Sequence, residues 1–164
     1  DWEKATNKKE FKVNTTTREF TEGLIKLRRS TNAFRLGDKE LVDLNVTLLE
    51  IPEIKESDLV IAYESKSTDN TGDYYVFVNA DTEARTLTLG DLDLSKGDVL
   101  VDSDEAGTKK VHKKSGFKLT KDTLTIDALT TIVIQVDNKD KKKPNKGHQG
   151  AKPTHPVADI PRKK

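Results

Sequence analysis

The feature that most constrains the fold of this chain is a short-period hydrophobic pattern in residues 41–136. Short apolar runs alternate there with turn-forming residues at intervals of roughly ten positions. Thr, Val and Ile are frequent in these runs, and they favour extended backbone. The pattern predicts an all-β domain, either an antiparallel sandwich or a barrel. The nine predicted strand runs are 46–51, 59–63, 74–78, 85–89, 99–101, 110–112, 117–119, 123–126 and 131–136.

One amphipathic helix is predicted before this domain. Phe20, Leu24 and Leu27 stand at i, i+4 and i+7, so a helix brings them into one apolar stripe. Gly23 lies inside the same helix, where glycine destabilises by ~1 kcal/mol relative to alanine. We therefore expect another element to approach the helix closely at Gly23, and we expect the stripe to need a partner surface.

The start of this helix is indicated by Thr16 and Glu19, which have the spacing of a capping box. In such a box each side chain accepts a hydrogen bond from a backbone N–H that the first helical turn leaves unpaired. The box predicts a helix from about residue 16 to about residue 29. The helix belongs to a first segment, residues 1–40, and the β domain follows as residues 41–136.

The third segment, residues 137–164, differs in composition from the rest. It holds nine Lys or Arg against three Asp, so its net charge is +6, while residues 1–136 carry −5. It also holds four of the five prolines and few apolar side chains, so it cannot offset the entropy lost on folding. We predict a disordered, basic linker. The lysine run 141–143 has no aromatic residues for base stacking, which favours a solvated spacer over a nucleic-acid site.

Motifs for catalysis or cofactor binding are missing from the sequence. The patterns GxGxxG, GxxxxGK[ST], GxSxG and HExxH do not occur. There is no cysteine, which excludes disulfides, thiolate metal sites and a cysteine nucleophile. His112, His148 and His155 are far apart, so solvent-exposed histidines are favoured over a metal site. We expect no catalytic residue, no cofactor and no metal in this chain.

Residues 102–107 resemble the opening of a calcium-binding loop. An EF-hand loop needs oxygen ligands where Ala106 and Lys113 stand, and it needs flanking helices. The neighbouring runs are predicted strands. An acidic hairpin turn is therefore favoured over a calcium site.

Two carboxylate pairs are candidates for an acid/base couple: Asp91 with Asp93, and Asp102 with Asp104. A glycosidase needs two carboxyl groups in a cleft, one of them with a pKa raised by burial. Both pairs lie in polar turns, which disfavours catalysis.

Tyr74 and Tyr75 are adjacent in a predicted strand, so their rings must point to opposite faces. Ordinary packing is favoured for both rings, and a sugar-stacking surface formed by one of them is the alternative.

A membrane-spanning segment is not expected, because no run approaches the ~20 apolar residues that a transmembrane helix needs. The chain starts at Asp1 without Met or a signal peptide, which indicates a mature or excised piece.

The sequence also carries a family resemblance. Residues 23–36, Gly-Leu-Ile-Lys-Leu-Arg-Arg-Ser-Thr-Asn-Ala-Phe-Arg-Leu, resemble the last barrel helix of type I pullulanases, debranching glycoside hydrolases of the α-amylase family. Residues 58–63 and 75–80 are similar to early strands of the C-terminal antiparallel β-sandwich of those enzymes. The resemblance spans residues 1–136 and is strongest to streptococcal surface-anchored pullulanases, also called alkaline amylopullulanases.

This resemblance implies a mainly β chain with the end of a (β/α)8 barrel at 1–40, a sandwich at 41–136 and a linker towards the cell wall at 137–164. The implied partner is the rest of the catalytic barrel, through Phe20, Leu24 and Leu27. The implied substrate of the parent is an α-glucan with α-1,6 branches, such as pullulan or glycogen, and the implied location is the bacterial cell surface.

The family's catalytic residues lie on earlier barrel strands, and the motifs that carry them do not occur here. The resemblance therefore assigns no catalytic residue to this chain, and the fragment alone is expected to be inactive. The alternatives are a surface carbohydrate-binding or adhesion module and a plain structural stalk domain.

Overall fold

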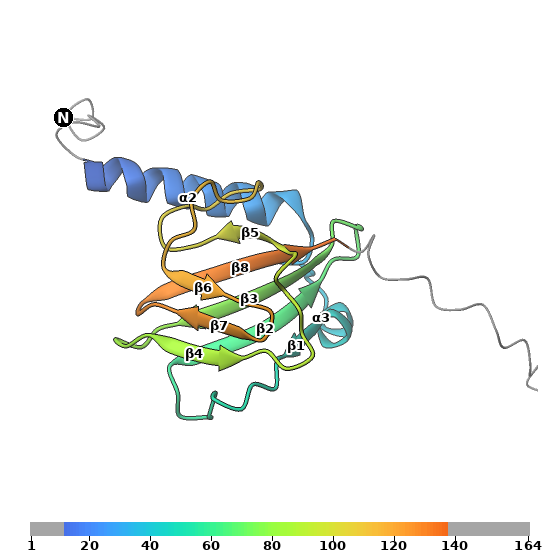
Figure 1. Ribbon diagram of the computed structural model, residues 1–164. Coiled ribbons are helices and arrows are strands. Elements are labelled where there is room, and N and C mark those ends of the chain that lie inside the picture. The colour runs from blue at the N-terminus through green and yellow to red at the C-terminus, as the bar shows by residue number, and fades with distance from the viewer. Residues whose placement is uncertain (1–11, 138–164) are drawn as a thin grey trace, which may run out of the picture.

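Two antiparallel β-sheets packed face to face form the body of the protein (Figure 1). The computed structural model describes residues 12–137. The larger sheet has the strand order β1 (Val46–Leu48), β2 (Val60–Lys66), β3 (Asp73–Asn79), β8 (Thr130–Val136) and β5 (Asp98–Val101). The smaller sheet has the order β4 (Arg85–Thr88), β7 (Thr123–Ile126) and β6 (Phe117–Leu119). The antiparallel sandwich predicted from the sequence is confirmed, and the barrel alternative is wrong.

The main core lies between the two sheets and follows from the alternation of side chains along each strand. Phe77 and Ile132 are cross-strand partners in the larger sheet and are fully buried. Leu124 and Ile126 of the smaller sheet face them and are fully buried as well. Their polar neighbours along β7, such as Thr125, point away from this core. The period of two in the sequence was thus a direct signal of this core.

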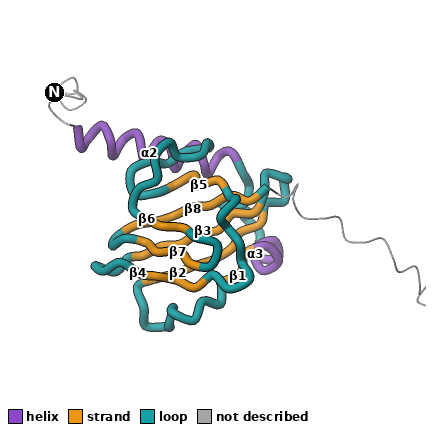
Figure 2. The backbone as a smooth tube through the Cα atoms, viewed as in Figure 1, coloured by secondary structure: helices purple, strands orange, loops and turns teal. Residues whose placement is uncertain are grey.

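Eight of the nine predicted runs contain a strand, and the run 110–112 does not. It lies in the long connection between β5 and β6, which Figure 2 draws as a loop. Val111 is buried and its N–H donates to the carbonyl oxygen of Val99 at 2.8 Å. A single buried anchor in a loop therefore produced the same polar–apolar–polar pattern as a strand.

A second helix, α3 (Lys39–Asn45), was not predicted and lies across the boundary drawn at residue 40. The Asp38 carboxylate caps it by accepting the N–H groups of Glu40 and Leu41, at 2.8 and 3.3 Å. Its apolar residues Leu41, Val42 and Leu44 are exposed, and seven residues are too few for a helical period to stand out in the sequence.

The predicted amphipathic helix is confirmed as α2 (Lys12–Ser30), but its predicted start is wrong. The helix already includes Lys12, which places Thr16 in the helix interior. The Thr16 hydroxyl donates to the carbonyl oxygen of Lys12 at 2.9 Å. This bond to the preceding turn is what a threonine makes inside a helix, so Thr16 does not cap it.

Helix α2 packs on the outer face of the larger sheet, where it forms a second core (Figure 1). Leu27 is buried against Tyr74, Val76 and Val133, and Phe20 is partly buried there. The expectation that Leu27 and Phe20 pack against the rest of the barrel is therefore corrected, because the sandwich of this chain covers both side chains. Leu24 remains 40% exposed.

Gly23 is the point where α2 comes closest to the sandwich. A Cβ atom placed on Gly23 would lie 1.8 Å from the carbonyl oxygen of Ala106. The predicted close approach is confirmed, but the neighbour is the β5–β6 connection of the same chain and not an absent barrel helix. The linker predicted for 137–164 lies, apart from Asp137, outside the described residues.

Candidate functional site

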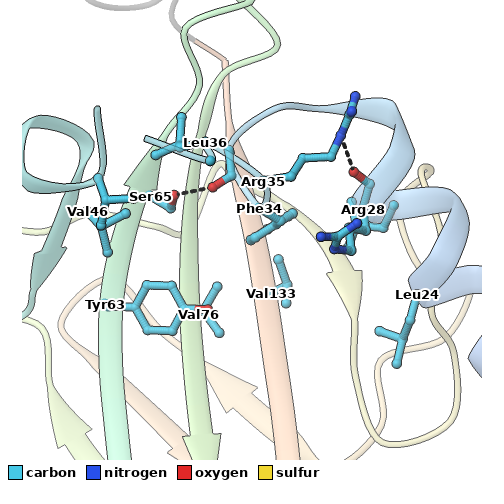
Figure 3. A pocket seen from close by; sticks show the side chains of 14 residues that line it. Leu24, Arg28, Phe34, Arg35, Leu36, Val46, Tyr63, Ser65, Val76 and Val133 are labelled. Atoms are coloured by element: carbon cyan, nitrogen blue, oxygen red, sulfur yellow. Dashed lines mark hydrogen bonds between the residues drawn. The ribbon is translucent and has the colours of Figure 1, made fainter. Parts of the chain in front are cut away.

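A groove of about 660 Å³ opens on the outer face of the larger sheet, between α2 and α3 (Figure 3). Its floor consists of Tyr63, Val76 and Val133, which are cross-strand partners on β2, β3 and β8. Because side chains alternate along a strand, this register puts all three on the outer face. Burial raises the pKa of Tyr63 above its ordinary value. The walls are formed by Leu24 and Arg28 of α2, by Phe34 and Leu36 of the connection between the helices, and by Val42 of α3.

The connection between the two helices fixes one end of the groove to the hairpin that joins β2 and β3. The Asn32 N–H donates to the Asp69 carboxylate at 2.8 Å. The Asn32 side chain accepts the N–H of Thr68 at 2.9 Å and donates to the Thr68 hydroxyl at 2.5 Å. Burial opposes ionisation of Asp69, but hydrogen bonds from Thr71 and Asn32 outweigh it and lower its pKa. Asn32 thus acts as a clamp between helix and hairpin.

Two further contacts hold the same connection in place. The Ser65 hydroxyl of β2 donates to the carbonyl oxygen of Ala33 at 2.7 Å (Figure 3). The ring of Phe34 meets the ring of Tyr74 edge to face, with 5.0 Å between the ring centroids. Such aromatic pairs add stability beyond the area that they bury. The groove is therefore built on a rigid frame.

The rim of the groove carries positive charge. The Arg35 side chain donates to the carbonyl oxygens of Arg28 and Arg29, at 3.1 and 3.3 Å, and so pairs groups that the end of α2 leaves free. Arg28 lines the groove from α2 (Figure 3). An apolar floor below two guanidinium groups suits an apolar partner surface with an acidic edge.

The acidic residues that resemble a calcium loop or an acid/base couple make structural contacts instead. Asp102 is buried, and one of its oxygens accepts the N–H groups of Asp104 and Glu105, both at 2.9 Å. Its other oxygen accepts the N–H of Ser115 at 3.0 Å. Asp102 thus shapes the β5–β6 connection, as a carboxylate does in an acidic turn. Within residues 12–137, no three His, Asp or Glu side chains are grouped so that they could hold a metal ion.

The second carboxylate pair has a similar local use. Asp93 accepts the hydroxyl and the N–H of Ser95, at 2.5 and 3.0 Å, and these bonds lower the pKa of Asp93. A carboxylate with a lowered pKa is a poor general acid near neutral pH. Asp91 is exposed.

The two adjacent tyrosines point to opposite faces of β3, as predicted. Tyr74 is buried in the second core and Tyr75 between the sheets. Burial, and then a hydrogen bond to Glu64 at 2.7 Å, raise the pKa of Tyr75. Packing accounts for both rings, and the sugar-stacking alternative at these residues is wrong.

His112 is exposed, and its Nδ1 lies 3.1 Å from a carboxylate oxygen of Glu105. His148, His155 and the lysine run 141–143 lie outside the described residues. No helix between residues 12 and 137 is both long enough and apolar enough to cross a membrane.

The groove residues were not identified from the sequence as one site, because they are far apart in the chain. Leu24, Val42 and Tyr63 come together only through the docking of α2 and the placement of α3. Residues 59–63 did carry a signal for the groove, because they are apolar at every position. Alternate side chains of this strand point away from the main core, so apolar residues on both faces indicate a second apolar surface.

Fold and surface together define an antiparallel β-sandwich domain with a helix docked on its outer face. More specifically, the chain belongs to the SpuA C-terminal family, whose model matches residues 45–137.

Relatives of this chain are streptococcal pullulanases. Pullulanase A of Streptococcus pneumoniae serotype 2 is 38% identical over 142 residues, which cover 83% of this chain and 11% of that protein. The crystal structure of the Group B Streptococcus pullulanase SAP matches with a TM-score of 0.76 and 45% identity, over 83% of this chain and 18% of that chain. The catalytic module of the glycogen-degrading pneumococcal virulence factor SpuA matches with a TM-score of 0.77 and 34% identity, over 88% of this chain and 21% of that chain. The chain thus spans about a tenth of the curated relative.

Proposed function

We propose that this chain is the C-terminal domain of a larger pullulanase that hydrolyses α-1,6 bonds in pullulan and glycogen. The observation that carries the proposal is the match to streptococcal pullulanases over more than four fifths of this chain, at 34 to 45% identity. In this proposal the catalytic residues belong to the preceding segment of the protein. The sandwich supports the catalytic barrel and does no chemistry itself.

The barrel contact is proposed for the exposed flank of α2. Phe20, Leu24 and Leu27 form the apolar stripe expected from the sequence to contact the barrel. Because Leu27 is buried under the sandwich, the flank that contains Leu24 and Ile25 is the better candidate; these side chains are 40% and 54% exposed. Exposed leucine and isoleucine side chains on one helix flank are typical of an interface.

The proposal is tested by comparing the parent protein with this chain alone. The intact parent should release reducing ends from pullulan, and this chain should release none. The parent truncated before residue 12 should lose thermal stability, because it loses the last helix and the sandwich together. A parent that leaves pullulan intact, or activity in this chain alone, would refute the proposal.

We also propose that the basic tail links the domain to the bacterial cell wall, outside the cell. Support comes from its composition, with +6 net charge and four prolines in residues 137–164, which suits an extended spacer near an anionic envelope. Antibodies against the sandwich should label intact cells, and protease treatment of intact cells should remove the label. Labelling that requires cell lysis would contradict a surface location.

A further inference from the structure

A run of lysines occupies the connection between β5 and β6, which Figure 2 draws as a loop, and continues into β6. Residues 108–121 hold six lysines and one histidine and no Asp or Glu. All six lysines are exposed. Short basic runs of this kind are typical of surfaces that bind polyanions such as nucleic acids and heparin. We call five of these lysines the cationic arc: Lys109, Lys110, Lys113, Lys114 and Lys118.

The backbone of this run is anchored to the sandwich on both sides of residues 112–114. Val111 is buried, and its N–H donates to a carbonyl oxygen of β5 at 2.8 Å. On the other side, the Ser115 N–H donates to the buried Asp102 carboxylate at 3.0 Å. The Ser115 hydroxyl also accepts the hydroxyl of Ser103 at 2.8 Å. The loop is therefore held in one shape, and a preformed surface loses less entropy when a ligand binds.

Most of the positive charge of the cationic arc is not neutralised by the sandwich. Within residues 12–137, Lys110 is the one arc lysine with a carboxylate at ion-pair distance, Asp98 at 3.4 Å. His112 lies between the arc lysines and contacts Glu105 at 3.1 Å. The other four ammonium groups have no acidic partner in the part of the chain that the structure describes, and each offers three hydrogen-bond donors.

The cationic arc continues onto a face of the smaller sheet that is rich in hydroxyl groups. Lys118 lies on the outer face of β6, and its cross-strand partner there is Thr125, which in turn faces Thr86. The hydroxyl oxygens of Thr86 and Thr125 are 2.9 Å apart. Their mutual bond uses one donor, so the other donor and the remaining lone pairs face solvent. Cations and hydroxyl groups thus adjoin on one surface.

We propose that the cationic arc and the adjoining threonine face bind a linear sulfated polysaccharide. The sulfate groups accept charge-assisted hydrogen bonds from the exposed ammonium groups. The sugar hydroxyls pair with the hydroxyls of Thr86 and Thr125. Such binding is a property of the sandwich itself and goes beyond the hydrolysis proposed for the parent protein.

Other polyanions and partners fit this surface less well. Single-stranded nucleic acid is bound through exposed aromatic rings, but the ring of Phe117 is half-buried and lies under the Lys114 ammonium, 5.9 Å from its centroid. A membrane or a protein partner needs apolar side chains beside the charges, but Val111 is buried and Leu119 half-buried. A polyol phosphate chain is more flexible than a chain of sugar rings, so it loses more entropy on a preformed surface.

Heparin is the probe, and its dissociation constant for the 164-residue chain is measured by isothermal titration calorimetry. The arc variant carries Lys113→Gln, Lys114→Gln and Lys118→Gln. The matched control carries the same charge change in the basic tail: Lys141→Gln, Lys142→Gln and Lys143→Gln. We expect heparin to bind at least about tenfold more weakly to the arc variant, because each exposed ion pair contributes little but three are removed together. The control should lose less than about threefold, through the change in net charge alone.

Equal losses in the two variants, or no binding of heparin to the unmodified chain, would overturn the inference. Urea unfolding checks that the arc variant is folded. If it is not, Lys109→Gln with Lys113→Gln replaces it, since both side chains are exposed and neither contacts Phe117.

Two further measurements identify the chemistry of the ligand. Thr125→Val keeps the shape of the side chain and removes its hydroxyl, so it should weaken heparin binding about threefold. An unchanged affinity would overturn the role of the threonine face. Desulfated heparin and pullulan should not compete with heparin, because they lack sulfate groups. Lipoteichoic acid and duplex DNA are compared at equal concentrations of anionic groups. Tighter binding of either phosphodiester polymer would overturn the assignment to a sulfated polysaccharide.

Discussion

Replacing Gly23 by alanine tests how α2 is held on the sandwich. In an exposed helix this change stabilises by ~1 kcal/mol. Here the new Cβ would lie 1.8 Å from the backbone oxygen of Ala106, which cannot turn away as a flexible side chain can. Overpacking of this kind typically costs about 1–3 kcal/mol, and a backbone overlap belongs at the upper end. The free energy of unfolding should therefore fall by about 2 kcal/mol once the propensity gain is subtracted.

Urea and thermal unfolding of the chain, followed by circular dichroism, measure this change. A loss of about 2 kcal/mol should lower Tm by roughly 6–10 °C in a domain of this size. Gly107→Ala is the matched control, because nothing lies within 4 Å of a Cβ at Gly107 and its φ is not in the left-handed region. Gly107→Ala should leave the stability unchanged or raise it slightly. If Gly23→Ala stabilises the chain as much as the control does, α2 is not docked as described.

Three further predictions concern packing, pH and sugar binding. Leu27→Ala should lower the free energy of unfolding of this chain by about 2–5 kcal/mol, because Leu27 is buried. Leu24→Ala should lower it by about 1 kcal/mol or less, because Leu24 is half-exposed. Similar losses for the two variants in urea titrations would contradict the different burial of these two leucines. The Lys55 N–H, and then Arg85, lower the pKa of Asp58 below 3.8. Ionised Asp58 therefore stabilises the folded chain at pH values above its ordinary pKa, and this stabilisation is lost as the pH falls through the lowered pKa. The urea midpoint of unfolding should decrease below about pH 4, and it should decrease less steeply in Asp58→Asn. In a maltotetraose titration followed by NMR, the chain should give no localised shifts; shifts at sub-millimolar ligand would favour the carbohydrate-binding alternative.

The strands were predictable because each buries its apolar side chains inside the sandwich, so the signal is local to each run. The helix α3 gave a weaker signal, since its seven residues span only about two turns and none of its side chains is buried; its start is capped by Asp38. Gly23 shows a different limit. Its presence in a helix predicted a close neighbour, but only the three-dimensional fold places Ala106 there.

The groove was beyond prediction for the same reason. Its apolar residues are individually unremarkable and become a surface only when elements distant in sequence meet. The capping-box error arose because Thr16 has the composition of a cap but sits a full turn inside the helix. Local spacing did not reveal that the helix continues in the N-terminal direction.

The contact between Gly23 and Ala106 also has a consequence for synthesis in the cell. Translation proceeds from the N-terminus, so α2 leaves the ribosome about 80 residues ahead of the loop that covers it. At about 5–20 residues per second this is a delay of several seconds. During that time Leu27 has no sandwich to pack against, and its apolar side chain is available to chaperones and proteases. A nascent protein that stops before Ala106 therefore exposes its own helix as a mark of incomplete synthesis, and the mark disappears when the last strands fold.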